Sequence, residues 1–372
     1  MHRKWEEFKK SMQPTIRELK FMIYRVSKSP LSVAGFAIIV FFVIVAICAP
    51  VLAPPQGSDP FMIPYDDLLR SRPISGSLSP IPPCKGHPFG TVFEQYDIYY
   101  GCIWGTINAF RVGLLVVGAA LIFGVAIGTI AGYYGGLVDE VIMRFTDIIF
   151  AFPGLILAMA LVVVIRDKQP IDASLLATIV AGVLFIIVAT RRVKVHFKVA
   201  MGAIFLVFLA LTFCNPLVIT IQFTRLDKVL LALMLIGWPG YARLIRGEVI
   251  KIRNEDFVEA AKAVGCSDLR IIVRHVLPNT IYSLLVVATL DTGSIVLTAA
   301  ALSFLGIGAP SGYADWGWMI SLSREWIGTG EMLVNYFHAF MIPGIFIFVF
   351  VLGWNLLGDA FRDILDPMLR RR

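Results

Sequence analysis

The sequence predicts an all-α membrane protein, a polytopic helical bundle with about eight transmembrane helices. Of 372 residues, 58% are hydrophobic and only 16% are charged, and the mean hydropathy is +0.78. Soluble domains contain roughly 45–50% apolar residues, so a water-soluble fold could not bury this much apolar surface. Several apolar stretches also reach the about 18 residues that cross a hydrocarbon core as a helix. The expected spans are 31–53, 107–132, 147–165, 173–190, 199–221, 229–246, 279–305 and 338–358.

The distribution of basic residues predicts the orientation of these spans. With the N-terminus inside, the inner segments are 1–30, 133–146, 191–198, 247–278 and 359–372. Counting Arg243 and Arg246 at the membrane edge, these segments hold 24 of the 33 Lys and Arg residues, and the outer segments hold 8. Cytoplasmic loops carry such an excess. We therefore expect a multi-pass protein of the inner (cytoplasmic) membrane with both termini in the cytoplasm, and the net charge of +7 requires no nucleic-acid partner.

The chain divides into a cytoplasmic arm, 1–30, and a transmembrane domain, 31–372. The first apolar run is too long, and starts too late, for a cleavable signal peptide. The outer segment 54–106 is rich in Pro, Gly and Ser, which predicts an ordered loop with little regular structure. Cys84 and Cys102 lie in this loop on the oxidising side, where they could form a disulfide or remain two free thiols. No cysteine or histidine cluster suggests a metal site.

One polar, amphipathic stretch interrupts the apolar pattern, "NEDFVEAAKAVGCSDLRIIVRHVLPNT" at 254–280. Its apolar residues form two helical faces separated by Gly265, and Pro278 marks the return to the membrane. We expect a helix–glycine–helix element on the cytoplasmic surface, within the loop 247–278. The two faces are Phe257, Ala260, Ala261 and Val264, then Leu269, Ile272, Val273 and Val276. A generic amphipathic interfacial helix would show a similar pattern.

This stretch resembles the EAA motif of permease subunits in ATP-binding-cassette (ABC) importers. The matching residues are Glu259, Ala260, Ala261, Gly265, Leu277 and Pro278. His275 replaces the usual Ile, as is common in the dipeptide/oligopeptide branch. Further segments are similar to that branch, in the same order: "HPFGT" at 87–91, "AGYYGG" at 131–136, "VDEVIMRFTDIIFAFP" at 138–153, "GWPGYARLIRGEV" at 237–249, "LSFLGIG" at 302–308 and "NLLGDAFRDILDP" at 355–367.

The resemblance implies a six-helix type I importer core whose EAA residues couple it to ATPases. The expected partners are a second homologous permease, two ATP-binding-cassette ATPase subunits, an extracellular substrate-binding protein and the lipid bilayer. The chain has no phosphate-binding loop, so we expect no catalysis and no cofactor on it, with ATP and Mg on the partner subunits. The implied substrates are di- or oligopeptides, and the branch also contains importers of β-linked oligosaccharides and of nickel. An autonomous channel or secondary carrier would instead predict several buried acids or inverted repeats.

The chain departs from this branch in two places. About 60 residues between 166 and 228 add two apolar runs, which predict an inserted helical hairpin. Relatives often carry a Glu shortly before the "LSFLG" stretch, but Ala299 stands there, and Asp291 is the nearby intramembrane acid. Asp291 is a candidate for the substrate pathway or for a structural pair. Arg111 is expected to snorkel to the outer surface. The ridge of Gly124, Gly128 and Gly132 predicts close helix packing.

Overall fold

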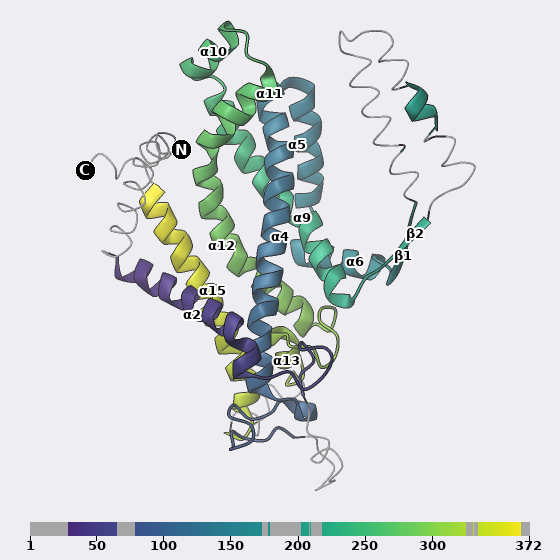
Figure 1. Ribbon diagram of the computed structural model, residues 1–372, viewed down its shortest axis with the longest axis vertical. Helices are drawn as coiled ribbons and strands as arrows, with labels where there is room; N and C mark the ends of the chain where they lie inside the picture. Colours follow the sequence, from purple (N-terminus) through teal and green to yellow (C-terminus); the bar gives the residue numbers. More distant parts are fainter. Residues whose placement is uncertain are drawn as a thin grey trace, which may run out of the picture. The chain divides into compact units, whose positions relative to one another are not determined.

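The computed structural model describes residues 29–64, 79–172, 178, 202–207, 209, 218–324, 330 and 334–365. Five of its helices are long and apolar enough to cross a membrane: α2 (Pro30–Leu52), α4 (Ile98–Tyr134), α9 (Arg225–Ile252), α12 (Leu277–Phe304, continuous with the shorter helices before it) and α15 (Phe337–Leu365). A bent pair, α5 (Gly136–Phe150) and α6 (Gly154–Val164), makes a sixth crossing if it counts as one span. The polytopic helical fold is thus confirmed (Figure 1).

Short elements connect these helices. They are η1 (Phe93–Gln95), β1 (Lys168–Asp172), β2 (Val218–Gln222), α10 (Asp256–Ala263), α11 (Asp268–Ile271), the π-helical turn η2 (Ile272–Val276) and α13 (Trp316–Ser321). In Figure 1, α10 and α11 lie at one end of α4 and α12, and α13 lies at the opposite end. We refer to the α10 end and the α13 end of these helices below.

The span expected at 147–165 is wrong in its position and shape. Residues 136–150, placed mainly in a loop, form α5, and the chain then bends by 90° before α6. The bend falls at Pro153, which has no amide hydrogen to donate and disfavours helical geometry at Phe152. At the other end of α5, Gly135 and Gly136 adopt φ values of +68° and +56°, which end α4 and reverse the chain at once.

The helix expected at 107–132 begins earlier, so the outer loop is shorter than 54–106. Asp97 caps α4, because its carboxylate accepts a hydrogen bond from the Tyr100 amide at 2.7 Å. The rest of the loop does have little regular structure among its described residues, apart from η1 and isolated bridges. One bridge pairs Met62 with Tyr313, which joins this segment to the α13 end.

Cys84 and Cys102 do not form a disulfide in the structure. The Cys84 side chain is exposed in the outer loop, whereas Cys102 lies fully buried within α4. The expectation of a disulfide fails because residue 102 belongs to a helix and not to the loop.

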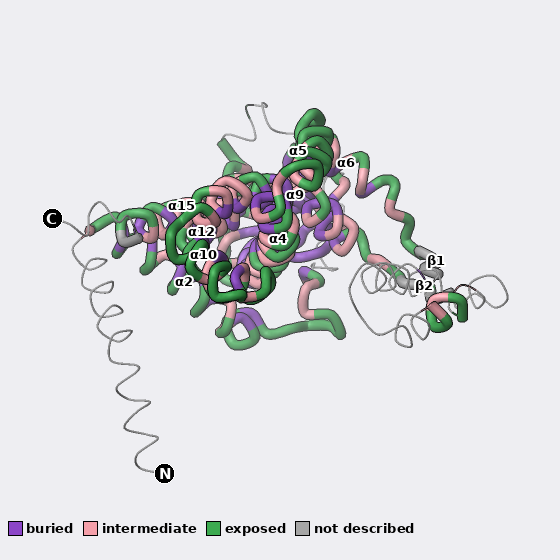
Figure 2. The backbone as a smooth tube through the Cα atoms, turned by 90° about the horizontal axis from the view of Figure 1, so that it is seen from above, coloured by how far each residue is buried: buried purple, intermediate pink, exposed green. Residues whose placement is uncertain are grey.

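The glycine ridge of α4 packs directly on α9, as predicted. A Cβ atom at Gly128 would lie 2.1 Å from Cγ2 of Ile245, and one at Gly124 would lie 2.3 Å from Cβ of Tyr241. Gly132 faces the backbone oxygen of Arg246 in the same way. In lipid, such close backbone approach is a principal source of helix association. Figure 2 shows the buried residues gathered where α4, α9 and α12 meet, with α5 largely exposed.

A second compact unit, Val163–Lys228, contains the antiparallel pair β1–β2. Lys168 pairs with Gln222 and Asp172 with Val218, so the two ends of the segment between these strands lie side by side. Lys228 and Asp167 form an ion pair at 2.5 Å beside these strands. Most of the spans expected at 173–190 and 199–221 lie outside the described residues. At 218–221 the prediction is wrong, because the strand β2 replaces the helix there.

The ridge predicts a position-specific effect within a single helix. Gly128→Leu should separate α4 from α9 and lower the free energy of unfolding by at least about 3 kcal/mol, at the upper end for overpacked cores. Gly118→Leu, on the same helix with nothing within 4 Å of a Cβ, is the matched control. The measurement is thermal unfolding of the detergent-purified chain. Equal midpoints for the two variants would contradict the packing argument.

Candidate functional site

Residues 254–276, the α10–α11 element, connect α9 to α12 at the α10 end. Gly265 turns the chain between the two helices with a φ of +85°, a conformation that L side chains rarely adopt. Its amide donates to the carbonyl of Lys262 at 2.9 Å, and the Cys266 amide donates to that of Ala261 at 3.1 Å, so α10 ends with satisfied carbonyls. Leu277 and Pro278 begin α12, where a proline is tolerated in the first turn.

The element buries one side against α9. Val258, Ile271 and Val276 have no measurable exposure and join Ile245 and Val249 in one apolar cluster. Val258 and Ile271 do not stand out in the sequence, because the apolar residues around them follow the helical spacing more regularly. The burial shows that this element is a packed part of the membrane domain.

The opposite side of the element carries large apolar side chains that the described chain leaves open. Phe257, Val264, Leu269 and Val273 are exposed by 44%, 85%, 72% and 56%. Glu259 and Ala260 are exposed beside them, and Ala261 is partly buried. Exposed apolar side chains gathered on a polar element mark an interaction surface.

Contacts from the element, and from Arg253 just before it, attach this region to the end of α4. The Tyr133 hydroxyl donates to Asp268 Oδ1 at 2.9 Å, and Lys262 Nζ lies 5.8 Å from the centre of the Tyr133 ring. Arg253 Nη1 donates to the carbonyl oxygens of Gly132 and Tyr133 at 2.9 and 3.1 Å. These two carbonyls belong to the last turn of α4 and would otherwise lack partners. A displacement of α10–α11 therefore acts on α4 as well as on α9 and α12.

Two ion pairs join α5 to α9 near the same end. Asp139 takes a two-pronged contact from Arg246, with Nη2 at 2.6 Å from Oδ2, and Asp147 pairs with Arg243 at 2.7 Å. The Arg243 guanidinium also lies 4.4 Å from the centre of the Phe150 ring. Paired hydrogen bonds between guanidinium and carboxylate are among the stronger polar contacts. They hold α5 on α9 although Thr146 is the only α5 residue that is buried.

Asp291 lies in the middle of α12, away from both ends. Its carboxyl faces the hydroxyl of Tyr241 on α9, and the Tyr241 ring is buried against Gly124. Asp291 itself is half-buried. The structure does not bring it together with the EAA residues, so the candidates from the sequence fall into two separate places.

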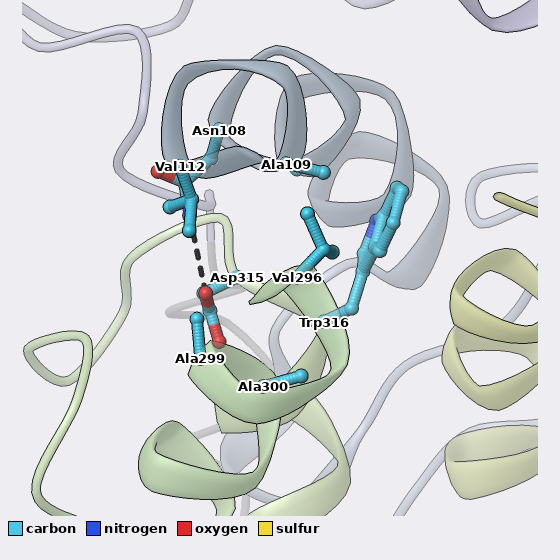
Figure 3. Close-up of a pocket in the computed structure, with 9 residues that line it drawn as sticks. Asn108, Ala109, Val112, Val296, Ala299, Ala300, Asp315 and Trp316 are labelled. Carbon is cyan, nitrogen blue, oxygen red and sulfur yellow. Dashed lines mark hydrogen bonds between the residues drawn. The ribbon is translucent and has the colours of Figure 1, made fainter. Parts of the chain in front are cut away.

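A further polar contact, unforeseen from the sequence, lies at the α13 end (Figure 3). Asn108 Nδ2 on α4 donates to Asp315 Oδ2 at 3.1 Å beside a cavity of about 10 Å³. Asp315 also caps α13 by accepting from the Trp318 amide at 2.9 Å. Burial raises the pKa of the Asp315 carboxyl above its ordinary value, against the lowering effect of these hydrogen bonds. The cavity is about the size of one water molecule, so it fits no substrate.

Two family models match this chain. Residues 124–371 match the family model "binding-protein-dependent transport system inner membrane component", and residues 20–72 match "N-terminal TM domain of oligopeptide transport permease C". A solved structure of an amino acid ABC transporter superposes with a TM-score of 0.39 at 16% identity, covering 73% of this chain and 94% of that one, too weakly to bear on the fold.

Individual relatives extend over nearly the whole chain. The dipeptide transport system permease protein DppC of Alkalihalophilus pseudofirmus is 32% identical, covering 93% of this chain and 88% of the relative. The glutathione transport system permease protein GsiD of Escherichia coli is 29% identical, covering 93% of this chain and 89% of the relative. The oligopeptide transport system permease protein OppC of Bacillus subtilis is 27% identical, covering 95% of this chain and 90% of the relative.

The contact between Tyr133 and Asp268 predicts a local loss of order. Tyr133→Phe removes one hydrogen bond, worth about 1 kcal/mol, so amide hydrogens in 256–271 should exchange about fivefold faster. Tyr134→Phe is the matched control, because Tyr134 is 56% exposed and its ring only contacts that of Tyr133. Hydrogen exchange read by mass spectrometry tests this, and unchanged exchange in the Tyr133 variant would show that the bond contributes nothing.

Proposed function

This chain belongs to the family of binding-protein-dependent transport system inner membrane components, and from that premise we propose that it is a permease subunit of an ABC importer for di- or oligopeptides. The observation that carries the proposal is similarity over more than nine-tenths of the chain to permeases for dipeptides and oligopeptides. Glutathione, the substrate named for a third relative, is itself a tripeptide. A second permease of the same kind would complete the translocation path.

The energy for transport comes from other subunits in this proposal. The sequence contains no phosphate-binding loop, so two separate ATPases hydrolyse ATP, and an extracellular binding protein delivers the peptide. The excess of Lys and Arg in the segments around the α10 end favours a cytoplasmic position for that end. The α13 end would then face the binding protein outside.

The α10–α11 element is the docking surface for an ATPase in this proposal. Its exposed apolar side chains suit a groove on a partner, and the neighbouring Glu259 can add a polar contact at the rim. The buried residues Val258 and Ile271, together with the contacts to Tyr133 and Gly132, would pass movement of the ATPase to α9 and α4. This is mechanical coupling through packed side chains and hydrogen bonds.

The turn at Gly265 gives a direct test of coupling. Gly265→Val forces a β-branched residue into the left-handed region, at a cost of about 1–2 kcal/mol, and should change the angle between α10 and α11. We expect peptide uptake per ATP hydrolysed to fall about tenfold in the reconstituted transporter, with normal amounts of the chain in the membrane. Glu259→Lys should lower the same ratio.

Gly306→Val is the matched control for backbone strain. Gly306 follows α12 at its other end with a φ of +82°, and a Cβ there would meet nothing within 4 Å, as at Gly265. The Gly306 variant should keep its ratio of uptake to hydrolysis. The coupling role fails if the Gly265 and Glu259 variants both transport normally.

The substrate class is tested with the complete transporter in proteoliposomes. We expect ATP-dependent uptake of a radiolabelled dipeptide such as Ala-Ala, and competition by unlabelled dipeptides but not by cello-oligosaccharides. The binding protein encoded beside this chain should show the same preference in a titration. Tight binding and uptake of cello-oligosaccharides without any response to peptides would exclude peptides as the substrate.

A further inference from the structure

The single carboxylate of Asp291 lies at the depth where a charge is least tolerated. It follows Leu277, the first residue of α12, by 14 positions and precedes Phe304, the last, by 13. At 1.5 Å per residue it is therefore about 20 Å from either end of the helix. Charged groups at this depth cost several kcal/mol unless they face protein, water or a counter-charge, and they usually mark a substrate or ion pathway.

The described part of the chain supplies no cation to balance this charge. The interaction that Asp291 makes there is with the neutral hydroxyl of Tyr241. Arg111, the basic residue inside a neighbouring span, interacts instead with Tyr313 at the α13 end. On α9, Arg243 and Arg246 are already paired with acids of α5, and Lys251 is paired with Glu248. The residues that the structure describes therefore leave the charge of Asp291 open to a cation from outside them.

The face of α12 that continues from Asp291 toward the α13 end is open and polar. Ser294 and Thr298 follow at i+3 and i+7, so they lie on the same face of the helix. Ser294 is exposed, and Thr298 Oγ1 donates to the Ser294 carbonyl at 2.9 Å, which leaves its oxygen free to accept. Both hydroxyl oxygens can therefore accept hydrogen bonds from a molecule beside this face.

Other helices cover most of the rest of this half of α12, except at Leu297, which is 52% exposed. Gly293 contacts Val351 and Trp354 on α15, and Thr292 contacts Gly113 on α4. The backbone of Ala300 lies against Gly317 of α13. The face with Asp291, Ser294 and Thr298 is thus the polar part of the surface that the described residues leave open on this half of α12.

We propose that Asp291 is the binding subsite for the α-ammonium group of the transported peptide, with Ser294 and Thr298 as adjoining hydrogen-bond acceptors. This inference rests on the proposed peptide substrate and adds a site to it. An ammonium group carries three donors and one positive charge, which match one carboxylate and two hydroxyl oxygens. The Tyr241 hydroxyl lies near the carboxylate on the protein side.

The first experiment reads the charge of this face without any substrate. Ser294→Cys is placed in the complete transporter, and its reaction with a cationic thiol reagent (trimethylammonioethyl methanethiosulfonate) is compared with that of an anionic one (sulfonatoethyl methanethiosulfonate). We expect the cationic reagent to react about tenfold faster relative to the anionic one, and Asp291→Asn to abolish the preference. The wild-type chain, with its five native cysteines, gives the background.

Thr289→Cys is the matched control, since residue 289 points to the other side of the same helix and its hydroxyl bonds to the backbone in an exposed position. It should show no preference that depends on Asp291. Equal rates of the two reagents at residue 294, or no reaction there, would overturn the proposal, because the face would then carry no effective charge or would lie in lipid.

The second experiment measures uptake of Ala-Ala by two variants of residue 291. Asp291→Glu keeps the charge and should keep most of the uptake, whereas Asp291→Asn should reduce it about tenfold at equal amounts of the chain in the membrane. Normal uptake by the Asn variant, whose amide imitates a protonated acid, would overturn the ammonium site while leaving the peptide importer intact. Failure of the wild-type transporter to import any peptide would instead count against the proposed function, and the labelling result would still report on the face.

Discussion

The close approach of helix backbones at small residues is the constraint on which the rest of this structure depends. Lipid tails are as apolar as leucine, so burial of apolar side chains contributes little to the association of membrane helices. Close van der Waals packing between the helices must drive it instead. The glycines of α4 admit α9 at Gly124 and Gly128. Gly35 of α2 leaves room for Leu356 of α15, and Gly358 of α15 leaves room for Leu290 of α12. Each of these three pairs of neighbouring helices thus has a glycine at which the two helices approach closely.

Several polar contacts near the ends of these helices then add direction to the packing. At the α10 end, Arg253 joins the last carbonyls of α4, and Arg246 joins Asp139 of α5. At the α13 end, Asp315 joins Asn108 and caps α13. A helix packed along its length and attached at its end moves as a rigid unit. Coupling over the length of the membrane requires such rigid elements.

The sequence predicted what hydropathy and local patterns determine, which is most of the fold and part of the site. The spans near 31–53, 279–305 and 338–358 agree with α2, α12 and α15 within a few residues at most ends, because apolar length alone defines them. α5 was missed because it carries Asp139 and Asp147, whose cost is offset by arginines about 100 positions later. The contact between Asn108 and Asp315 spans 207 positions and has no local pattern. The strand β2 replaced helix where apolar β-branched residues fit either structure.

Two surfaces of this chain would be exposed to an unfavourable solvent if the chain were alone: apolar side chains to water, and a carboxylate to hydrocarbon. Large apolar side chains on α5, such as Leu137 and Val141, are exposed at membrane depth and suit lipid. Phe257, Val264 and Leu269 are equally exposed but belong to a polar element beyond the membrane helices, where water is the solvent. The face of Asp291 has the reverse mismatch, a charge at the depth of hydrocarbon. Neither mismatch can be relieved by repacking the chain, because the other sides of both elements are already filled. Among the described residues nothing covers either surface, which suits a chain of a family whose members are components of larger transport systems.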